Sequence, residues 1–158
     1  MTVTVKIEGL SELDAKLGEL SKAAGKAALR RSLKKSAEPL AALMQSLAPD
    51  REGSPAERDL RQSIAVSTKL SKRQASMHRK MFRNDKAAVE MFVGAGKLPH
   101  PHLVEFGTFK MDPQPFARPA WDQDKMALLE RLKDALRVEI EKSVARARRK
   151  AARLAAKG

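Results

Sequence analysis

Hydrophobic positions near the N-terminus follow first the period of a strand and then that of a helix. Apolar and polar residues alternate over residues 2–8, which is the pattern of a half-buried strand. Over residues 10–20, leucines recur at steps of three and four, which indicates one face of a helix with Ser11 as its N-cap. The stripe resumes over residues 29–47, where Pro39 predicts a kink or break because proline cannot donate a backbone hydrogen bond.

The middle of the chain predicts short strands separated by turns and one basic loop. Residues 49–55 are rich in Gly, Pro and charged residues and predict a loop. Alternation over residues 64–70 and 89–93 predicts two strands, which we expect to pair antiparallel. Between them, residues 71–86 contain six cations and one acidic residue without a sustained apolar period, so we expect an exposed, mobile basic loop. Residues 98–119 hold five of the eight prolines and predict only short helical turns and extended pieces.

The C-terminal segment carries the clearest helical signal. Pro119 suits a first helical residue, and a helix over residues 119–156 would measure about 57 Å at about 1.5 Å per residue. A globule of this chain length has a radius of gyration of only about 15 Å, so the far end must leave the domain or fray. The apolar positions that share one face of this helix are Leu129, Leu132, Leu136, Ile140, Val144, Ala147, Ala151 and Leu154.

Together these patterns predict an α+β fold. A small antiparallel sheet packs against a long N-terminal helix, and a long C-terminal helix extends from the domain. We expect a single domain over residues 1–144, with its exposed basic loop at 71–86, and a basic Ala/Arg/Lys helical extension over residues 145–158.

Charge adds a prediction about partners. The chain has a formal net charge of +13, and the seven cations after Glu141 are not balanced by any acidic residue. The macrodipole favours cations only in the last helical turn, so it does not explain a run over four turns. We expect contact with a polyanion or an acidic protein surface. The alternative for the tail is a solvated helix face that keeps an Ala-rich segment soluble. The candidate DNA or partner contacts are Lys72, Arg73, Arg79, Lys80, Arg83, Arg146, Arg148, Arg149, Lys150 and Arg153.

Composition excludes several classes of function. There is no cysteine, which rules out disulfides, Cys-ligated zinc, iron–sulfur clusters and thiol nucleophiles. Aromatic residues make up only 4% of the chain, which argues against base-stacking platforms and aromatic-lined pockets. No apolar run approaches the roughly 20 residues of a membrane span, and the N-terminus lacks the pattern of a signal peptide. We therefore expect a soluble intracellular product.

Candidate catalytic and metal chemistry is sparse. His100, His102 and Glu105 could in principle meet one divalent ion, but Pro101 forces an extended link between the two imidazoles, and we interpret these as polar turn residues. No Gly-x-Ser-x-Gly, His-Glu-x-x-His or phosphate-binding Gly-rich loop occurs. The expectation is a protein that is not an enzyme and that needs no metal or cofactor.

Three segments, taken in order, resemble a known family. They read VKIEGLSELDAKLGEL, LAPDREGSPAERDLRQSI and HPHLVEFGTFKMDPQPFARPAWD, the last preceding the long terminal helix. The set resembles the minor tail-component, or tail-completion, family of long-tailed double-stranded-DNA bacteriophages. The most specific part is Val104-Glu105-Phe106-Gly107-Thr108 followed by Gln114-Pro115-Phe116-Ala117-Arg118-Pro119-Ala120.

This resemblance implies a non-enzymatic virion protein with an α+β fold. Such a protein would form a homo-oligomeric ring around the DNA channel of the head-to-tail neck. Its partners would be the adjacent head-closure protein and the tail-terminator or tail-tube protein, with packaged double-stranded DNA as a further candidate. It would be located in the virion neck or tail after assembly in the host bacterial cytoplasm. The alternative interpretation is a free basic nucleic-acid-binding protein, which the charge favours but which leaves the Pro-rich segment unexplained.

The resemblance carries over structural positions only, and their chemistry suggests roles. Glu105 lies in an apolar stretch and needs a partner, for which Arg118 is the candidate in a bidentate ion pair. Gly107 permits a positive φ at the exit of the turn. We expect Phe106, Phe116 and Trp121 to pack the segment onto the sheet. The structural motif comprises Val104, Glu105, Phe106, Gly107, Thr108, Pro115, Phe116, Arg118 and Pro119.

Overall fold

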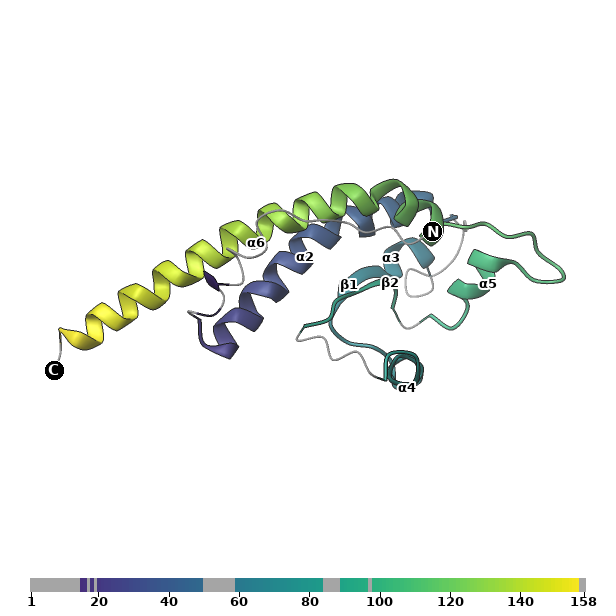
Figure 1. Cartoon of the computed structure of the whole chain (residues 1–158). Helices are drawn as coiled ribbons and strands as arrows, with labels where there is room; N and C mark the ends of the chain where they lie inside the picture. The colour runs from purple at the N-terminus through teal and green to yellow at the C-terminus, as the bar shows by residue number, and fades with distance from the viewer. Residues whose placement is uncertain are drawn as a thin grey trace.

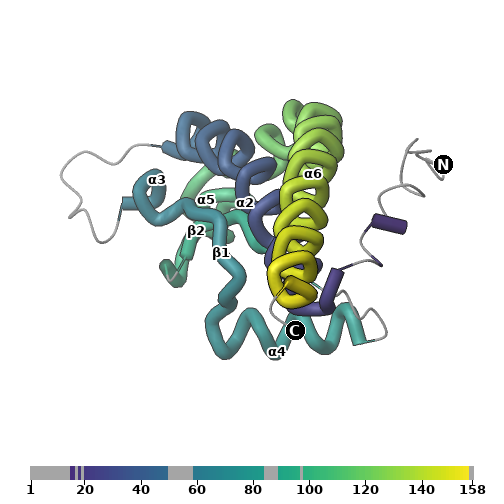
Figure 2. The backbone as a smooth tube through the Cα atoms, turned by 90° about the vertical axis from the view of Figure 1, so that its left-hand side faces the viewer, coloured from purple at the N-terminus to yellow at the C-terminus, as the bar shows by residue number. Residues whose placement is uncertain are grey.

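Two long helices lie side by side and a small sheet packs beneath them (Figures 1 and 2). The computed structural model describes residues 15–16, 18, 20–49, 59–83, 89–96 and 98–156. In chain order the elements are α2 (Lys22–Leu47), α3 (Leu60–Ser63), β1 (Ile64–Ser67), α4 (Lys72–Met81), β2 (Phe92–Ala95), α5 (Pro101–Phe106) and α6 (Ala117–Ala155). The strand expected at residues 2–8 and the N-cap expected at Ser11 lie outside the described residues.

Helix α2 runs without a break through Pro39, contrary to the interruption expected there. Its N-cap is Ser21, whose hydroxyl accepts a hydrogen bond from the Ala24 N–H at 3.3 Å. Pro39 cannot donate to the Lys35 carbonyl, but both residues are exposed, so water can reach that carbonyl. The carbonyl of Ser36 accepts from the Arg131 guanidinium of α6 at 3.4 Å. Solvent thus accommodates the hydrogen bond that the proline removes.

Small and polar residues bring α2 close to α6. Gly25, Ala28, Ser32 and Ser36 are buried along this face of α2. The Ser32 hydroxyl donates to the Ala135 carbonyl of α6 at 3.2 Å, so the buried polar groups are paired.

An ion pair also joins the two long helices. Arg31 Nε lies 2.6 Å from Glu139 Oε2, and this hydrogen bond lowers the pKa of Glu139 despite the opposing effect of burial. Arg31 Nη2 reaches Ser143 Oγ at 3.5 Å. Arg31 therefore ties the N-terminal half of α2 to two positions on α6.

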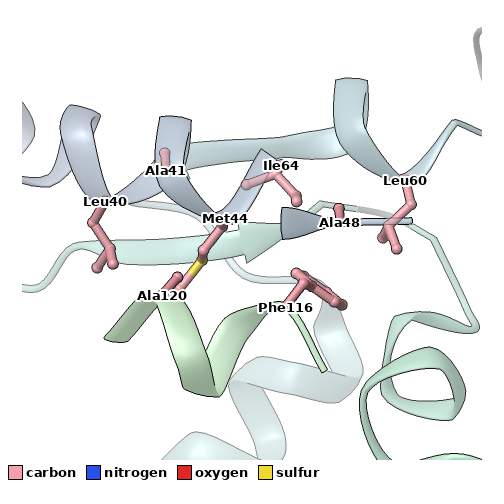
Figure 3. Close-up of a cluster of buried hydrophobic side chains, with 8 residues drawn as sticks. All are labelled: Leu40, Ala41, Met44, Ala48, Leu60, Ile64, Phe116 and Ala120. Atoms are coloured by element: carbon pink, nitrogen blue, oxygen red, sulfur yellow. The ribbon is translucent and has the colours of Figure 1, made fainter. Parts of the chain in front are cut away.

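The antiparallel pairing expected between the two strands is confirmed, but their predicted bounds are wrong: β1 ends at Ser67 rather than at residue 70, and β2 covers Phe92–Ala95 rather than residues 89–93. β1 pairs with β2 in a register that places Ile64 opposite Ala95 and Val66 opposite Val93. Ile64 is buried against the second half of α2, where the main core contains Leu40, Ala41, Met44, Ala48, Leu60, Ile64, Phe116 and Ala120 (Figure 3). A smaller cluster of Leu20, Ile140 and Val144 lies between α2 and α6. The predicted fold class, α+β with one long helix at each end, is confirmed.

The segment expected to be a basic loop at residues 71–86 instead contains a helix, α4. Ser71 and Gln74 form a capping box, in which each side chain bonds the backbone N–H of the other residue. No residue of α4 is buried, and the loop structure expected for this segment is wrong. The helix contacts the sheet through His78, whose ring centroid lies 5.3 Å from that of Phe92.

Helix α6 begins two residues before the predicted start and spans 39 residues. Pro119 lies in its first turn, where a missing N–H costs little. Its buried residues are Ala120, Ala135, Ile140, Ser143 and Val144, and every described residue after Val144 is exposed. The far end of α6 therefore leaves the core, as its length predicts.

Candidate functional site

The Pro-rich segment between β2 and α6 folds into a short helix and a hairpin. Helix α5 ends at Gly107, whose N–H donates to the Leu103 carbonyl at 2.8 Å. Thr108 and Met111 then pair as an antiparallel bridge, with N–H to carbonyl distances of 2.8 and 3.3 Å. We call residues 107–113 the Phe109 hairpin, after the residue in its turn. The short turns predicted for this segment are confirmed.

Gly107 is required by the backbone at the start of the hairpin. Its φ is 77° and its ψ is 179°, a region that essentially only glycine adopts, and the predicted positive φ is confirmed. A Cβ built there would lie 2.9 Å from both the Met111 carbonyl oxygen and the Pro113 nitrogen. These are backbone atoms, which cannot rotate away as a side chain would.

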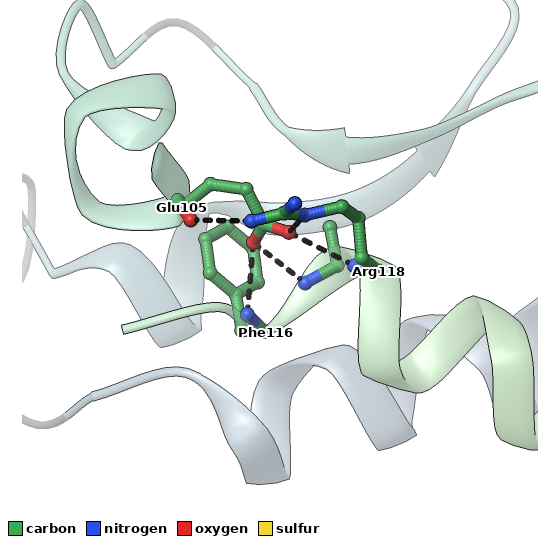
Figure 4. A network of polar contacts seen from close by, with 4 residues as sticks. Glu105, Phe116 and Arg118 are labelled. Carbon is green, nitrogen blue, oxygen red and sulfur yellow. Dashed lines mark hydrogen bonds and ion pairs between the residues drawn. The ribbon is translucent and has the colours of Figure 1, made fainter. Parts of the chain in front are cut away.

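The Glu105 carboxylate caps the N-terminus of α6 (Figure 4). Oε2 accepts from the N–H groups of Phe116 at 2.8 Å and Ala117 at 2.9 Å, and Oε1 accepts from that of Arg118 at 3.0 Å. These are the orphan donors at a helix start, where the macrodipole also favours a negative charge. The N-cap residue Phe116 has no side-chain acceptor of its own, so Glu105 supplies the cap from 11 residues upstream.

Burial and hydrogen bonding act in opposite directions on Glu105. Burial alone would raise the pKa of this carboxyl. The three backbone N–H groups and the Arg118 side chain bond the ionised form, and together they lower the pKa below its ordinary value. Glu105 is therefore a charged group whose ionisation the fold stabilises.

The expected ion pair between Glu105 and Arg118 is present, but it is not bidentate. Arg118 Nε lies 3.0 Å from Glu105 Oε1, whereas Nη2 donates to the backbone carbonyl of Glu105 at 3.0 Å. The Arg118 side chain is 58% exposed and that of Glu105 only 7%. Water therefore screens the arginine, and the backbone N–H groups are the main buried partners of the carboxylate.

Of the three aromatic residues expected to pack this segment onto the sheet, one does so. Phe116 is buried in the main core beside Ala120 and Leu60 (Figure 3). Phe106 is 65% exposed and lies beneath the Arg118 guanidinium at 4.6 Å, and Trp121 is 50% exposed, so the expectation is wrong for both. Phe106 is the last residue of α5 and is exposed, whereas the two residues before it, Val104 and Glu105, are half-buried and buried.

Sequence reasoning missed Phe109. Its side chain is fully exposed at the turn of the Phe109 hairpin, beside the exposed Lys110. Nothing in the alternation or charge of the segment distinguishes Phe109 from Phe106 or Phe116. The one signal that could have indicated its exposure was its position two residues after Gly107, in a segment too short to bury the side chains on both of its faces.

The predicted basic contacts form two exposed surfaces rather than one. Lys72, Arg73, Arg79 and Lys80 lie on α4, and Arg83 follows that helix. On α6, steps of four, seven, eight and eleven residues place five exposed cations on one face, namely Lys142, Arg146, Arg149, Lys150 and Arg153. Arg148 lies on another side of α6. The two surfaces are far apart along the molecule (Figure 1).

An apolar groove separates the N-terminal end of α2 from the C-terminal end of α6. Its volume is about 560 Å³. The apolar residues that line it are Leu20, Ala24, Ala27, Ala147, Ala151 and Leu154, and Arg31, Arg146 and Lys150 lie at its sides. We call it the α2/α6 groove. The helical spacing of apolar residues predicted an apolar stripe on this part of α6 but not the facing wall from α2.

The constellation of His100, His102 and Glu105 does not meet around an ion. Both oxygens of Glu105 already accept hydrogen bonds from α6. Within the described ranges, no group of three or more His, Cys, Asp or Glu side chains could hold a metal. None of the helices in this part of the chain is both long and apolar enough to cross a membrane.

Comparison with known proteins identifies a family. Residues 11–107, more than half of the chain, match the family model HK97-gp10-like, described as "Bacteriophage HK97-gp10, putative tail-component". The matched range includes α2, the sheet, α4 and α5 and ends at Gly107, before the Phe109 hairpin and α6. No curated protein and no solved structure matches the chain.

Proposed function

The chain belongs to the HK97-gp10-like family of bacteriophage tail components, and from this premise we propose that it joins tail to head in the neck or tail-completion complex. It is a structural protein of the virion. In this proposal it assembles as a homo-oligomeric ring around the DNA channel, after synthesis in the host cytoplasm. Its neighbours are the head-closure protein on one side and the tail-terminator or tail-tube protein on the other.

Family membership carries this proposal, and the shape of the chain supports it. Apolar surfaces that a domain does not bury in its own core often mark contacts with other proteins. Among the described residues, Phe109 is fully exposed, an apolar groove lies between α2 and α6, and α4 buries none of its residues. Assembly with neighbouring subunits would cover such surfaces. We therefore assign residues 1–144 to the body of the subunit and residues 145–158 to an assembly extension.

The test is to delete the gene from the phage or phage-derived particle that encodes it. We expect full heads and complete tails that fail to join, and restoration of joining when the wild-type chain is supplied. Labelled protein should be located at the neck by electron microscopy. Complete particles formed without the protein, or label confined to the distal end of the tail, would contradict the proposal.

A second candidate function, binding of double-stranded DNA, is favoured by the basic face of α6. Five cations within 12 residues can contact phosphates and release their condensed counterions. If the basic face of α6 lines the lumen of the ring, it would guide packaged DNA. If the protein is free, the same face would bind nucleic acid in general.

A salt series distinguishes these possibilities from an acidic protein contact. If the face binds phosphates, retention of duplex DNA should fall steeply with salt, and Arg146→Gln with Arg149→Gln should reduce that slope by about two. A comparison pair replaces Arg73 and Lys80 of α4, which belong to the other predicted basic surface. A slope that neither pair changes would argue against DNA as the partner.

A further inference from the structure

The Phe109 hairpin presents an aromatic side chain to solvent on a rigid support. The Thr108–Met111 bridge closes the hairpin, and the Gln114 N–H donates to the Val104 carbonyl at 2.9 Å. Gly107 fixes its entry and the Glu105 cap fixes the start of the helix that follows it. Exposing a phenyl ring to water is unfavourable, and a constrained backbone prevents it from collapsing onto the core. A preorganised aromatic residue of this kind is suited to binding, because little conformational entropy is lost on contact.

The α2/α6 groove has the complementary shape and chemistry. Its floor is formed largely by alanines, which leave room for a larger side chain between the two helices. The volume of about 560 Å³ is within the range, about 300–1,000 Å³, of pockets that receive compact groups. Arg146 and Lys150 lie at its sides and can place a cation over an aromatic face.

We propose that Phe109 of one copy of the chain inserts into the α2/α6 groove of the next copy. The inference rests on the proposed ring. The hairpin follows α5, whereas the groove is lined by the N-terminal end of α2 and the C-terminal end of α6; these segments lie at opposite ends of the molecule (Figure 1), so the hairpin cannot reach the groove of its own chain. Two different surfaces that bind each other make a head-to-tail contact, which closes into a ring when the rotation between copies permits.

The chemistry of the groove favours a second copy over DNA as the occupant. The hairpin carries Lys110 next to Phe109 and the exposed carboxylate of Asp112 three residues after it, so of these two charges only Asp112 can pair with Arg146 or Lys150 at the groove. Duplex DNA could contact those cations, but it offers no group that would fill the apolar floor. A neighbouring copy supplies both the aromatic ring and the carboxylate.

The absence of native cysteine makes a disulfide test direct. The double variant Lys110→Cys/Ala151→Cys places one thiol beside Phe109 and one in the groove while keeping Phe109 itself. Because Ala152 is exposed and does not line the groove, Lys110→Cys/Ala152→Cys is the matched control. Mild oxidation of the purified chain and of assembled particles should produce a ladder of covalent oligomers from the first variant only. Equal ladders from both variants, or none from either, would overturn the proposal.

A second measurement does not depend on disulfide geometry. Phe109→Ser should raise the dissociation constant of the subunit contact by about thirtyfold, the effect of losing a central aromatic contact. Met126→Ser, at an exposed methionine outside the groove, should leave it unchanged. Sedimentation velocity measures both. If Phe109→Ser leaves the oligomer intact but stops heads joining tails, Phe109 binds another neck protein. The docking proposal then fails while the proposed function stands.

Discussion

Replacing Glu105 with alanine should destabilise the protein mainly by removing a helix cap, not by breaking an ion pair. The carboxylate accepts three backbone N–H bonds at 2.8 to 3.0 Å and one bond from the Arg118 side chain at 3.0 Å. In Glu105→Ala all four donors lose this acceptor. Water can replace it for the exposed guanidinium, but the N–H of Phe116 lies in a buried position and has no alternative.

The magnitude follows from these differences in exposure. Loss of an N-cap costs about 1–2 kcal/mol, and a buried donor without an acceptor costs about 2 kcal/mol more. We therefore expect Glu105→Ala to lower the free energy of unfolding by about 3–4 kcal/mol. For a chain of this size that corresponds to a fall in Tm of about 10 °C. Arg118→Ala removes an exposed ion pair and should cost only about 1 kcal/mol.

Thermal unfolding of four proteins, followed by far-ultraviolet circular dichroism, tests this reasoning. They are the wild type, Glu105→Ala, Glu105→Gln and Arg118→Ala. Glutamine keeps one acceptor oxygen without the charge, so its Tm should lie between those of the wild type and Glu105→Ala. If Arg118→Ala lowers Tm as much as Glu105→Ala does, the ion pair dominates and the capping argument is refuted.

Three further predictions follow from the same structure. Folding lowers the pKa of Glu105, so the stability that the carboxylate contributes is present at neutral pH and is lost as pH falls through the acid range. The difference in stability between the wild type and Glu105→Gln should therefore shrink between about pH 7 and about pH 3, which urea titrations measure. Gly107→Ala should lower stability by about 3 kcal/mol through a strained φ and a backbone clash, whereas Gly94→Ala, with open space around the added methyl, should have little effect on the same melting curve. Truncation after Val144 should leave Tm nearly unchanged while abolishing oligomers in sedimentation, and a large fall in Tm would show that the extension belongs to the core.

The spacing of apolar residues predicted the helices and strands that bury one regular face. It failed for the helix that buries no side chain. The strands at Ile64 and Val93 and the long terminal helix each bury apolar side chains at strand or helix spacing. Helix α4 buries nothing, so it carried no apolar stripe, and its only local signal was the Ser71-x-x-Gln74 capping box. Pro39 failed as a helix breaker because its cost depends on whether the affected carbonyl is exposed, which the sequence does not reveal.

The residues of the candidate site and the pairing of Glu105 with Arg118 were predictable, but the hydrogen bonds from Glu105 to the backbone of α6 were not. A lone Glu105 in an apolar stretch indicates a buried partner, and Gly107 indicates a positive φ; both interpretations are local in sequence. The partner of Glu105 is the start of a helix 11 to 13 residues away, reached through the hairpin. The exposed Phe109 and the groove were not predictable, because each depends on which segments the tertiary fold brings together.

Phe116 links the stability of the core to the presentation of the hairpin. Its side chain packs in the main core while its N–H binds Glu105, so one residue fixes both the position of α6 and the C-terminal end of the Phe109 hairpin segment. Because Phe116 is held by the packed core, it also restricts the motion of the exposed turn that precedes it. Weakening the cap at Glu105 should therefore loosen Phe109 before it unfolds the core. In the proposed contact between copies, the role of the buried Glu105 would be to hold the exposed Phe109 in place for binding.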